Sequence, residues 1–290
     1  MQERAASAAA HPWRRELAVA VEAAHAAGQL LRDGFGRAIP QRRKGAHDVV
    51  TALDGAAERE IMGRLSSAFP ADRRLGEESG LTIPRRQPAA GPRRTWIVDP
   101  LDGTVNFAAG IPFWCVSIAL AEGATVVIGV IHDPLRGETV TAVSGRGARP
   151  WPDGDRLAMR RLRRTADAVL CADPGAIGDD GAEGRIATLR PLVRAVRTLG
   201  STALSLTALA QGRLDGVLQV RGLGAVDVAA AGLIAAEAGA RVTDAEGGPW
   251  IVVDEPERGT GIAAACPALH RRLIAPGQAS ARRAPGGSSK

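Results

Sequence analysis

The chain has 290 residues, of which 45% are hydrophobic and 23% are charged. This length allows one large domain or two ordinary ones, and the composition excludes a chain that is disordered throughout. The formal net charge of +6 and the calculated isoelectric point of about 10.3 keep a nucleic acid or an acidic membrane surface as candidate partners.

Two helices are expected in the first quarter of the chain. Residues 1–12 are alanine-rich and of low complexity, so we expect them to be disordered. Apolar residues recur at helical spacing over 13–33, and Gly34 provides a stop signal. A second helical pattern covers 55–69 and ends at Pro70.

The pattern changes to strands after a proline- and arginine-rich loop at 84–94. Short runs rich in apolar and β-branched residues occupy 95–98, 115–120, 125–131 and 139–143. Because no helical pattern separates these runs, we expect them to form an antiparallel meander.

Helices and strands alternate after residue 150. Residues 276–290 are rich in Gly, Ser, Pro and Arg and are predicted to form a disordered basic tail. The layout predicts an N-terminal subdomain over 13–150 and a C-terminal subdomain over 151–275, each with helices packed on a sheet. In the second subdomain we expect strands at 169–171, 214–220 and 261–265, and helices at 186–193, 201–210, 227–238 and 267–274.

Cysteine and histidine spacing argues against a soft-metal site. Cys115, Cys171 and Cys266 form no CxxC pair, and the five histidines form no HExxH or HxH cluster. No apolar run approaches the ~20 residues that span a bilayer. The first ten residues lack the compact apolar stretch of a signal peptide. We therefore expect a cytoplasmic protein with no membrane partner.

The strongest chemical signal is the segment Asp-Pro-Leu-Asp-Gly-Thr, which directly follows the strand at 95–98. Asp99 and Asp102 repel each other in a tight turn unless a cation lies between them, and the segment contains no Lys or Arg. Magnesium prefers carboxylate and carbonyl oxygens, and the Leu101 carbonyl could serve as a ligand. The Gly103 and Thr104 amides resemble a phosphate-binding helix start. An exposed turn that caps a helix is the alternative.

Three further acidic sites have an ordinary explanation and a functional one. Glu77 and Glu78 form a loop pair, which by itself is typical of a solvated surface. Asp54 precedes the second helix and could simply cap it. Asp227 leads a helix that is apolar all round, so its carboxylate is either a cap or a buried group that requires a partner.

Together, these segments resemble the inositol monophosphatase family of magnesium-dependent, lithium-sensitive phosphatases. The resemblance rests on Gly-Glu-Glu-Ser at 76–79, Asp-Pro-Leu-Asp-Gly-Thr-Val-Asn-Phe at 99–107, and the segment 227–239. It covers about residues 13–275, with the segments in matching order and spacing. It implies a mixed α/β or α+β fold, the layered αβαβα sandwich of the inositol monophosphatase and fructose bisphosphatase type, which is usually assembled as a homodimer.

The resemblance also implies roles for individual residues. Asp54 and Thr104 match the pair that orients and deprotonates the attacking water, with Glu77 close to that water. The amides of Gly103 and Thr104 match those that hold the phosphate. Two or three Mg²⁺ ions would be held by five groups, Glu77, Asp99, the Leu101 carbonyl, Asp102 and Asp227.

The substrate side of the implied site departs from the family pattern. Ser201, Thr202 and Gln219 match positions that contact substrate hydroxyls. Gln219 stands where inositol-1-phosphate hydrolases carry a glutamate, so a hydrogen-bond acceptor remains but its charge is lost. Val226 replaces a tryptophan beside the metal-binding aspartate. We therefore expect a small cyclitol, polyol or sugar monophosphate as the substrate.

The implied reaction is direct attack by a metal-activated water, without a phosphoenzyme. The Asp-x-x-Asp spacing disfavours phosphatases that use an Asp-x-Asp nucleophile. Histidinol phosphate, a 3′-phosphonucleotide or fructose bisphosphate remain alternative substrates. A regulatory or nucleic-acid-binding protein built on this fold remains the alternative from another class. With 3% aromatic residues and no tyrosine, the chain lacks an aromatic RNA-binding platform, so nucleic acid is the weaker candidate.

Overall fold

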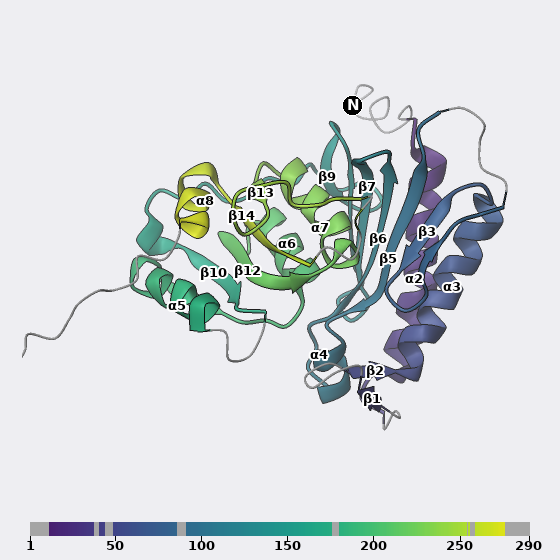
Figure 1. Ribbon diagram of the computed structural model, residues 1–290, viewed down its shortest axis with the longest axis horizontal. Helices are drawn as coiled ribbons and strands as arrows, with labels where there is room; N and C mark the ends of the chain where they lie inside the picture. The colour runs from purple at the N-terminus through teal and green to yellow at the C-terminus, as the bar shows by residue number, and fades with distance from the viewer. Residues whose placement is uncertain are drawn as a thin grey trace, which may run out of the picture.

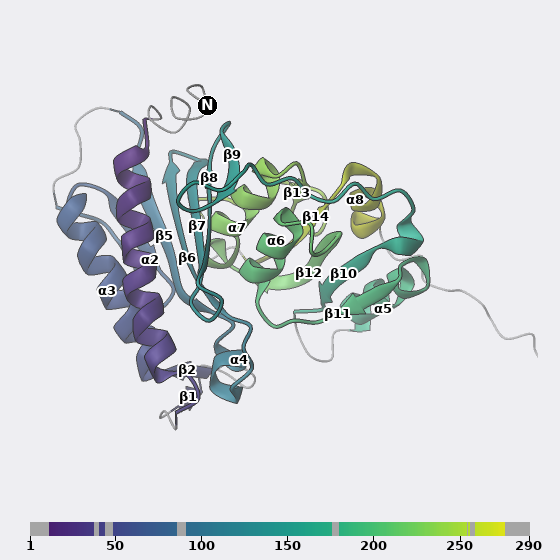
Figure 2. The same cartoon turned by 180° about the vertical axis from the view of Figure 1, so that it is seen from behind.

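A computed structural model describes residues 12–37, 41–43, 49–85, 91–175, 180–253, 255 and 259–275. The predicted tail at 276–290, the predicted N-terminal segment apart from Pro12, and residues 86–90 of the predicted loop lie outside the described residues. The elements form five layers, with helices outside and between two sheets (Figures 1 and 2). This is the αβαβα sandwich, so the predicted fold class is confirmed.

Helices α2 (Arg14–Gly34) and α3 (Ala52–Ala68) form the first layer. They pack against each other and on β5, β6 and β7 of the larger sheet. Between them, β1 (Gln41–Arg43) pairs antiparallel with β2 (Val49–Thr51). Both predicted helices are confirmed, but α3 begins three residues earlier than the pattern indicated, which places Asp54 inside its first turn.

The second layer is a seven-stranded sheet in the order β4-β3-β5-β6-β7-β8-β9. From β5 to β9 all neighbours are antiparallel, which confirms the predicted meander. In contrast, β3 pairs parallel with β5, so the carboxyl ends of these two strands meet at one edge. The strands are β3 (Arg73–Gly76), β4 (Gly80–Thr82), β5 (Arg94–Asp102), β6 (Cys115–Glu122), β7 (Thr125–Asp133), β8 (Glu138–Val143) and β9 (Gly147–Pro150).

The fourth layer is a five-stranded sheet in the order β11-β10-β12-β14-β13. Its strands β10 and β12 run parallel, and α5 (Asp180–Leu189) and α8 (Pro267–Ile274) cover its outer face as the fifth layer (Figure 1). The predicted helix at 186–193 is wrong at its end, where a 3-10 turn (Arg190–Leu192) contains Pro191, whose ring blocks a continuing α-helix. The strands are β10 (Val169–Asp173), β11 (Ala195–Arg197), β12 (Gly216–Leu223), β13 (Arg241–Thr243) and β14 (Thr260–Ala265).

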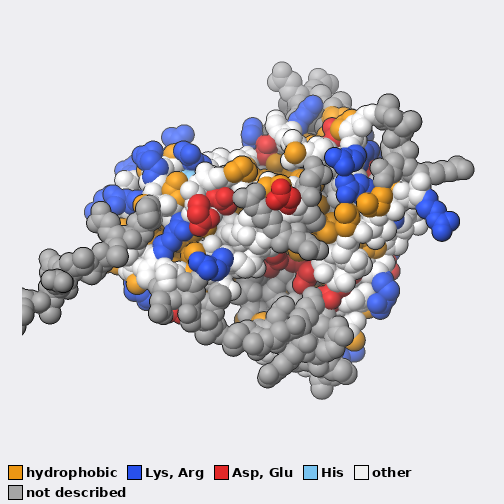
Figure 3. All heavy atoms as spheres, viewed as in Figure 1, with side chains coloured by type: hydrophobic (Ala, Val, Ile, Leu, Met, Phe, Trp, Pro, Cys, Tyr) orange, Lys and Arg blue, Asp and Glu red, His pale blue; other side chains and the backbone are white. Residues whose placement is uncertain are grey.

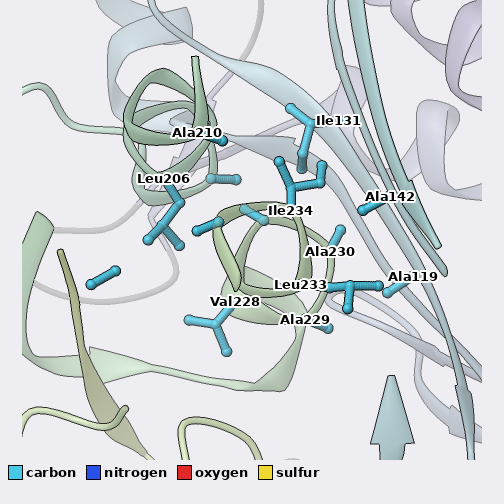
Figure 4. Packing of buried hydrophobic residues seen from close by; sticks show 14 of the residues in the cluster. Ala119, Ile131, Ala142, Leu206, Ala210, Val228, Ala229, Ala230, Leu233 and Ile234 are labelled. Carbon is cyan, nitrogen blue, oxygen red and sulfur yellow. The ribbon is translucent and has the colours of Figure 1, made fainter. Parts of the chain in front are cut away.

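Helices α6 (Thr202–Ala210) and α7 (Ala225–Glu237) form the middle layer and contact both sheets. Figure 4 shows α7 between α6 and the larger sheet, with Leu233 directed toward Ala119. Small residues allow this close packing. A side chain on Gly129 of β7 would place its Cβ 2.5 Å from the Ala230 carbonyl oxygen. One apolar core therefore continues across the boundary at residue 150, and it fixes the position at which α7 begins.

No helix among the described residues is long and apolar enough to cross a membrane.

Candidate metal centre and active site

Three carboxylates from distant parts of the chain meet between the two sheets. Asp99 and Asp102 lie at the end of β5, and Asp227 is the third residue of α7. One carboxylate oxygen from each lies within 4.8 Å of the others. The sequence predicted each of these residues, and the structure brings all three together.

The end of β5 is shaped to present both of its aspartates. The pairing with β6 shifts register between Asp99 and Asp102, which is a bulge that lets both side chains reach the same side. The Leu101 amide donates to Asp99 Oδ1 (2.9 Å) and stabilises this turn. Gly103 then has φ 98° and begins α4 (Thr104–Ala109). A Cβ on Gly103 would lie 3.0 Å from the Phe113 carbonyl oxygen, so both the conformation and the space require glycine.

The carboxylate cluster is electrostatically unfavourable by itself. Burial, and then the neighbouring carboxylates of Glu77 and Asp102, raise the pKa of Asp99 well above its usual range. Burial, and next the charge of Asp102, raise the pKa of Asp227 to about 7. The pKa of Asp102 is raised by burial, although a hydrogen bond from Ser201 opposes this. Buried carboxylates of this kind require a cation.

The surroundings supply no cation of their own. The cluster opens into a cavity of about 290 Å³, and no Lys, Arg or His is among the described residues that line it. Lys and Arg side chains instead occupy the outer parts of the face seen in Figure 3, while acidic side chains gather near its middle. The donor set therefore consists of carboxylates and the Leu101 carbonyl, which fits a hard divalent cation such as Mg²⁺.

The beginning of α6 holds Asp102 in place. The Ser201 hydroxyl and the Ala203 amide (2.8 Å) both donate to Asp102 Oδ2. Ser201 also caps α6 by accepting from the Leu204 amide (3.2 Å). Its side chain thus contacts a candidate metal ligand, and Ser201, which lines the cavity, is only 4% exposed.

Asp54 and Thr104 meet as the sequence predicted. The Thr104 hydroxyl lies 3.3 Å from Asp54 Oδ1 and 3.0 Å from the Leu101 carbonyl oxygen. Asp54 is buried in the first turn of α3. The hydroxyl therefore lies between a carboxylate and a candidate metal ligand.

Glu77 lies in a turn that is fixed by a residue that the sequence reasoning missed. Glu58 of α3 is buried, and its two carboxylate oxygens accept from the Glu78 amide (2.8 Å) and the Ser79 amide (2.9 Å). A Cβ on Gly76 would lie 2.7 Å from Glu58 Oε2, so the glycine allows the carboxylate to approach. The signal that could have identified Glu58 is its spacing of four residues from Asp54, which places both on one helix face.

Asn106 is a second residue without a predicted role. Its Nδ2 donates to the Phe113 and Leu199 carbonyls, both at 2.8 Å. A Cβ on Gly200, which has φ 75°, would lie 2.8 Å from the same amide. Asn106 of α4 therefore joins the segment that contains Phe113 to the loop that precedes α6.

Thr202 and Gln219 form a pair on the opposite wall of the cavity. The Thr202 hydroxyl donates to Gln219 Oε1 (2.5 Å), and both residues line the cavity. The pairing of β12 with β14 shifts register between Gln219 and Leu223, so the strand contains a bulge just before α7. Val226 lies in the first turn of α7 and packs against the shared apolar core.

Comparisons with known proteins agree with this geometry. A family model described as the inositol monophosphatase family matches residues 13–281. Inositol monophosphatase 2 of Solanum lycopersicum is 39% identical over 233 residues, which cover 79% of this chain and 87% of that protein. The Nus factor SuhB of Pasteurella multocida is 35% identical over 245 residues, which cover 80% and 86% of the two chains. The crystal structure of the extragenic suppressor protein suhB from Bartonella henselae matches with a TM-score of 0.82 at 33% identity, covering 92% of this chain and 99% of that chain.

Proposed function

The chain belongs to the inositol monophosphatase family and is a phosphoric monoester hydrolase, and on that premise we propose that it hydrolyses a small cyclitol or sugar monophosphate with Mg²⁺ as the metal. The observation that carries the proposal is the cluster of buried Asp99 and Asp102 with half-buried Asp227, whose carboxylate oxygens lie within 4.8 Å of one another. A phosphate dianion cannot approach such a cluster unless cations lie between them.

The residues that would hold the metal are Glu77, Asp99, the Leu101 carbonyl, Asp102 and Asp227. When bound, two or three Mg²⁺ ions would neutralise the phosphate and lower the pKa of an attached water. Ser201 and Glu58 would act through other residues, because one fixes the Asp102 carboxylate and the other fixes the turn that carries Glu77.

Thr104 and Asp54 would handle the proton of the attacking water. The hydroxyl can accept a hydrogen bond from water while it donates its own proton toward Asp54 Oδ1, 3.3 Å away. A carboxylate in that position can receive the proton as the water attacks phosphorus. The amides of Gly103 and Thr104 line the same cavity and would orient the phosphate oxygens.

Phosphate release from inositol 1-phosphate tests the proposal. We expect turnover with Mg²⁺, loss of turnover in EDTA, and at least a ~100-fold lower kcat/KM for Asp99→Asn, since one ligand loses its charge. Asp153→Asn is the matched control, because Asp153 is exposed and does not line the cavity. Full turnover in chelator, or wild-type rates in Asp99→Asn, would refute the metal-dependent mechanism.

A regulatory role is the second candidate, since relatives named Nus factor SuhB match most of the chain. If Asp99→Asn left hydrolysis intact and abolished only RNA retention, this candidate would replace the first. The homodimer that the resemblance implies stays a prediction, which sedimentation velocity can test.

A further inference from the structure

Asp173 lies at the carboxyl end of β10 and lines the same cavity as the carboxylate cluster, to which β5 and α7 contribute. Strand β10 pairs parallel with β12, and Asp173 is directly opposite Gln219 in the register. Paired residues on parallel strands direct their side chains to the same face. The carboxyl ends of parallel strands are also where folds of this kind bind ligands.

The neighbouring contacts establish which face this is. Cys171, two residues before Asp173, places its Sγ 3.3 Å from the Ser205 hydroxyl of α6. Gln219 accepts from Thr202 at the start of the same helix. The face that carries Asp173 is therefore directed toward α6 and the cavity, and Asp173 is among the residues that line the cavity.

The orientation of Asp173 is fixed while part of its carboxylate can still serve a ligand. Asp173 Oδ1 accepts from the Gly175 amide (2.8 Å). A carboxylate offers about four lone-pair positions, so this bond leaves acceptor capacity directed at the cavity. Next to it are two neutral side chains: the Thr202 hydroxyl donates to Gln219 Oε1, and Gln219 Nε2 donates to the Arg221 carbonyl (3.4 Å).

The distribution of charge in the cavity separates Asp173 from the metal cluster. Four of the carboxylates that line it, those of Glu77, Asp99, Asp102 and Asp227, surround the candidate metal centre. Asp173 is the remaining one, and no lining residue among those described carries a positive charge. The wall that faces the non-reacting part of the substrate is therefore suited to hydroxyl groups and unsuited to a second phosphate.

We propose that Asp173 is the specificity-determining residue of this cavity, accepting hydrogen bonds from hydroxyls of a neutral polyol and excluding substrates with a second phosphate. The inference rests on the proposed function, and it identifies a carboxylate that takes over the charged acceptor role which Gln219 lacks. Paired with the Gln219 amide, it suits two adjacent hydroxyl groups.

The test compares the wild type with Asp173→Asn in saturating Mg²⁺ on four esters: inositol 1-phosphate, p-nitrophenyl phosphate, fructose 1,6-bisphosphate and histidinol phosphate. Asn keeps the Oδ1 acceptor for the Gly175 amide, removes the charge and replaces the second carboxylate oxygen with an NH₂ donor. For inositol 1-phosphate we expect kcat/KM to fall by about 10- to 100-fold, mainly through KM. For p-nitrophenyl phosphate, which carries no hydroxyls, we expect no change. For fructose 1,6-bisphosphate we expect kcat/KM to rise relative to inositol 1-phosphate. Asp153→Asn again provides the control.

Other results would contradict the specificity role, the hydroxyl assignment or the proposed function, and they can be told apart. If Asp173→Asn hydrolyses inositol 1-phosphate like the wild type, the specificity role is wrong while the phosphatase assignment stands. Equal losses on inositol 1-phosphate and p-nitrophenyl phosphate would mean a general defect of the site and would also overturn the specificity role. If the wild type prefers histidinol phosphate and the variant loses that preference, Asp173 recognises an ammonium group and the hydroxyl assignment is wrong. A wild type that hydrolyses none of these esters would overturn the proposed function itself.

Discussion

Glu58→Gln tests whether a buried carboxylate outside the metal cluster sets the position of Glu77. Glu58 accepts two backbone hydrogen bonds from the turn that follows Glu77, at 2.8 and 2.9 Å. Gln keeps one carbonyl acceptor, but it places an NH₂ donor against the second backbone N–H. The variant therefore loses one charge-assisted bond and weakens the other.

The expected cost follows from the energies of such bonds. A hydrogen bond to a charged group contributes ~1.5–3 kcal/mol, and a buried donor left without a partner costs ~1–3 kcal/mol. We expect Glu58→Gln to lower the free energy of unfolding by about 2–4 kcal/mol. Because residues that orient metal ligands typically change metal affinity by ~10- to 100-fold, we also expect the half-saturating Mg²⁺ concentration to rise by at least tenfold.

The assay measures hydrolysis of p-nitrophenyl phosphate across a Mg²⁺ titration, together with urea unfolding of the same samples. Glu60→Gln is the control on the same helix, since the Glu60 side chain is 40% exposed and pairs with Arg64 one turn away, a contact worth ~0.3–0.5 kcal/mol. Gly76→Ala should reproduce the effect from the other side of the contact, because its Cβ would meet Glu58 at 2.7 Å. If Glu58→Gln is destabilised but its Mg²⁺ midpoint is unchanged, Glu58 contributes to stability only and does not set the position of Glu77.

Two further variants separate metal binding from folding, and a third tests the pH dependence of stability. Ser201→Ala removes both the cap of α6 and a donor to Asp102. We expect the free energy of unfolding in urea to fall by ~1–2 kcal/mol and Mg²⁺ binding to weaken. Unchanged Mg²⁺ binding would show that Ser201 does not position Asp102 as a ligand. Asp227→Asn removes a carboxylate whose pKa burial, and next the charge of Asp102, raise to about 7. At pH 8 without metal, the variant's melting temperature should therefore exceed that of the wild type, and Mg²⁺ should no longer raise it; a lower melting temperature would contradict the electrostatic argument. Burial, and then the charge of His25, lower the pKa of His132 from 6.5 to about 4. As the pH falls, the unfolded chain therefore binds a proton at His132 before the folded chain does. The free energy of unfolding should fall by up to ~3 kcal/mol between pH 6.5 and pH 4. His132→Gln should flatten that pH dependence in urea titrations, and an unaltered slope would assign it to other groups.

The carboxylates of the site could be predicted from the sequence because their immediate neighbours restrict them. Asp99 and Asp102 stand three residues apart directly after an apolar strand, and Asp227 leads a helix with no polar face. Each pattern has a helix-capping alternative, but the resemblance of these segments to one family favours the metal-binding interpretation of all three. The structure brings the three together within 4.8 Å.

Glu58 and Asp173 could not be predicted in the same way because their partners are distant in sequence. The bonds of Glu58 join residues that are 20 and 21 positions apart, and an acidic residue within a helix is ordinarily read as part of its solvated face. The role proposed for Asp173 follows only from the register of β10 with β12, which places it opposite Gln219. The short strands β3 and β11 were missed because segments such as Arg73–Gly76 have no alternating apolar pattern and are strands only through pairing with neighbours.

The position of Asp227 links the stability of the fold to the function of the site. A carboxylate with a pKa near 7 is held beside two others, which opposes folding of the metal-free chain. Helix α7 can hold it there because apolar side chains are buried all along the helix, against both sheets and α6. The approach is close because Gly129 leaves room for the Ala230 carbonyl. A bulkier residue at position 129 would push α7 away from β7 and move Asp227 away from Asp99, so a packing change far from the cavity would weaken the metal centre.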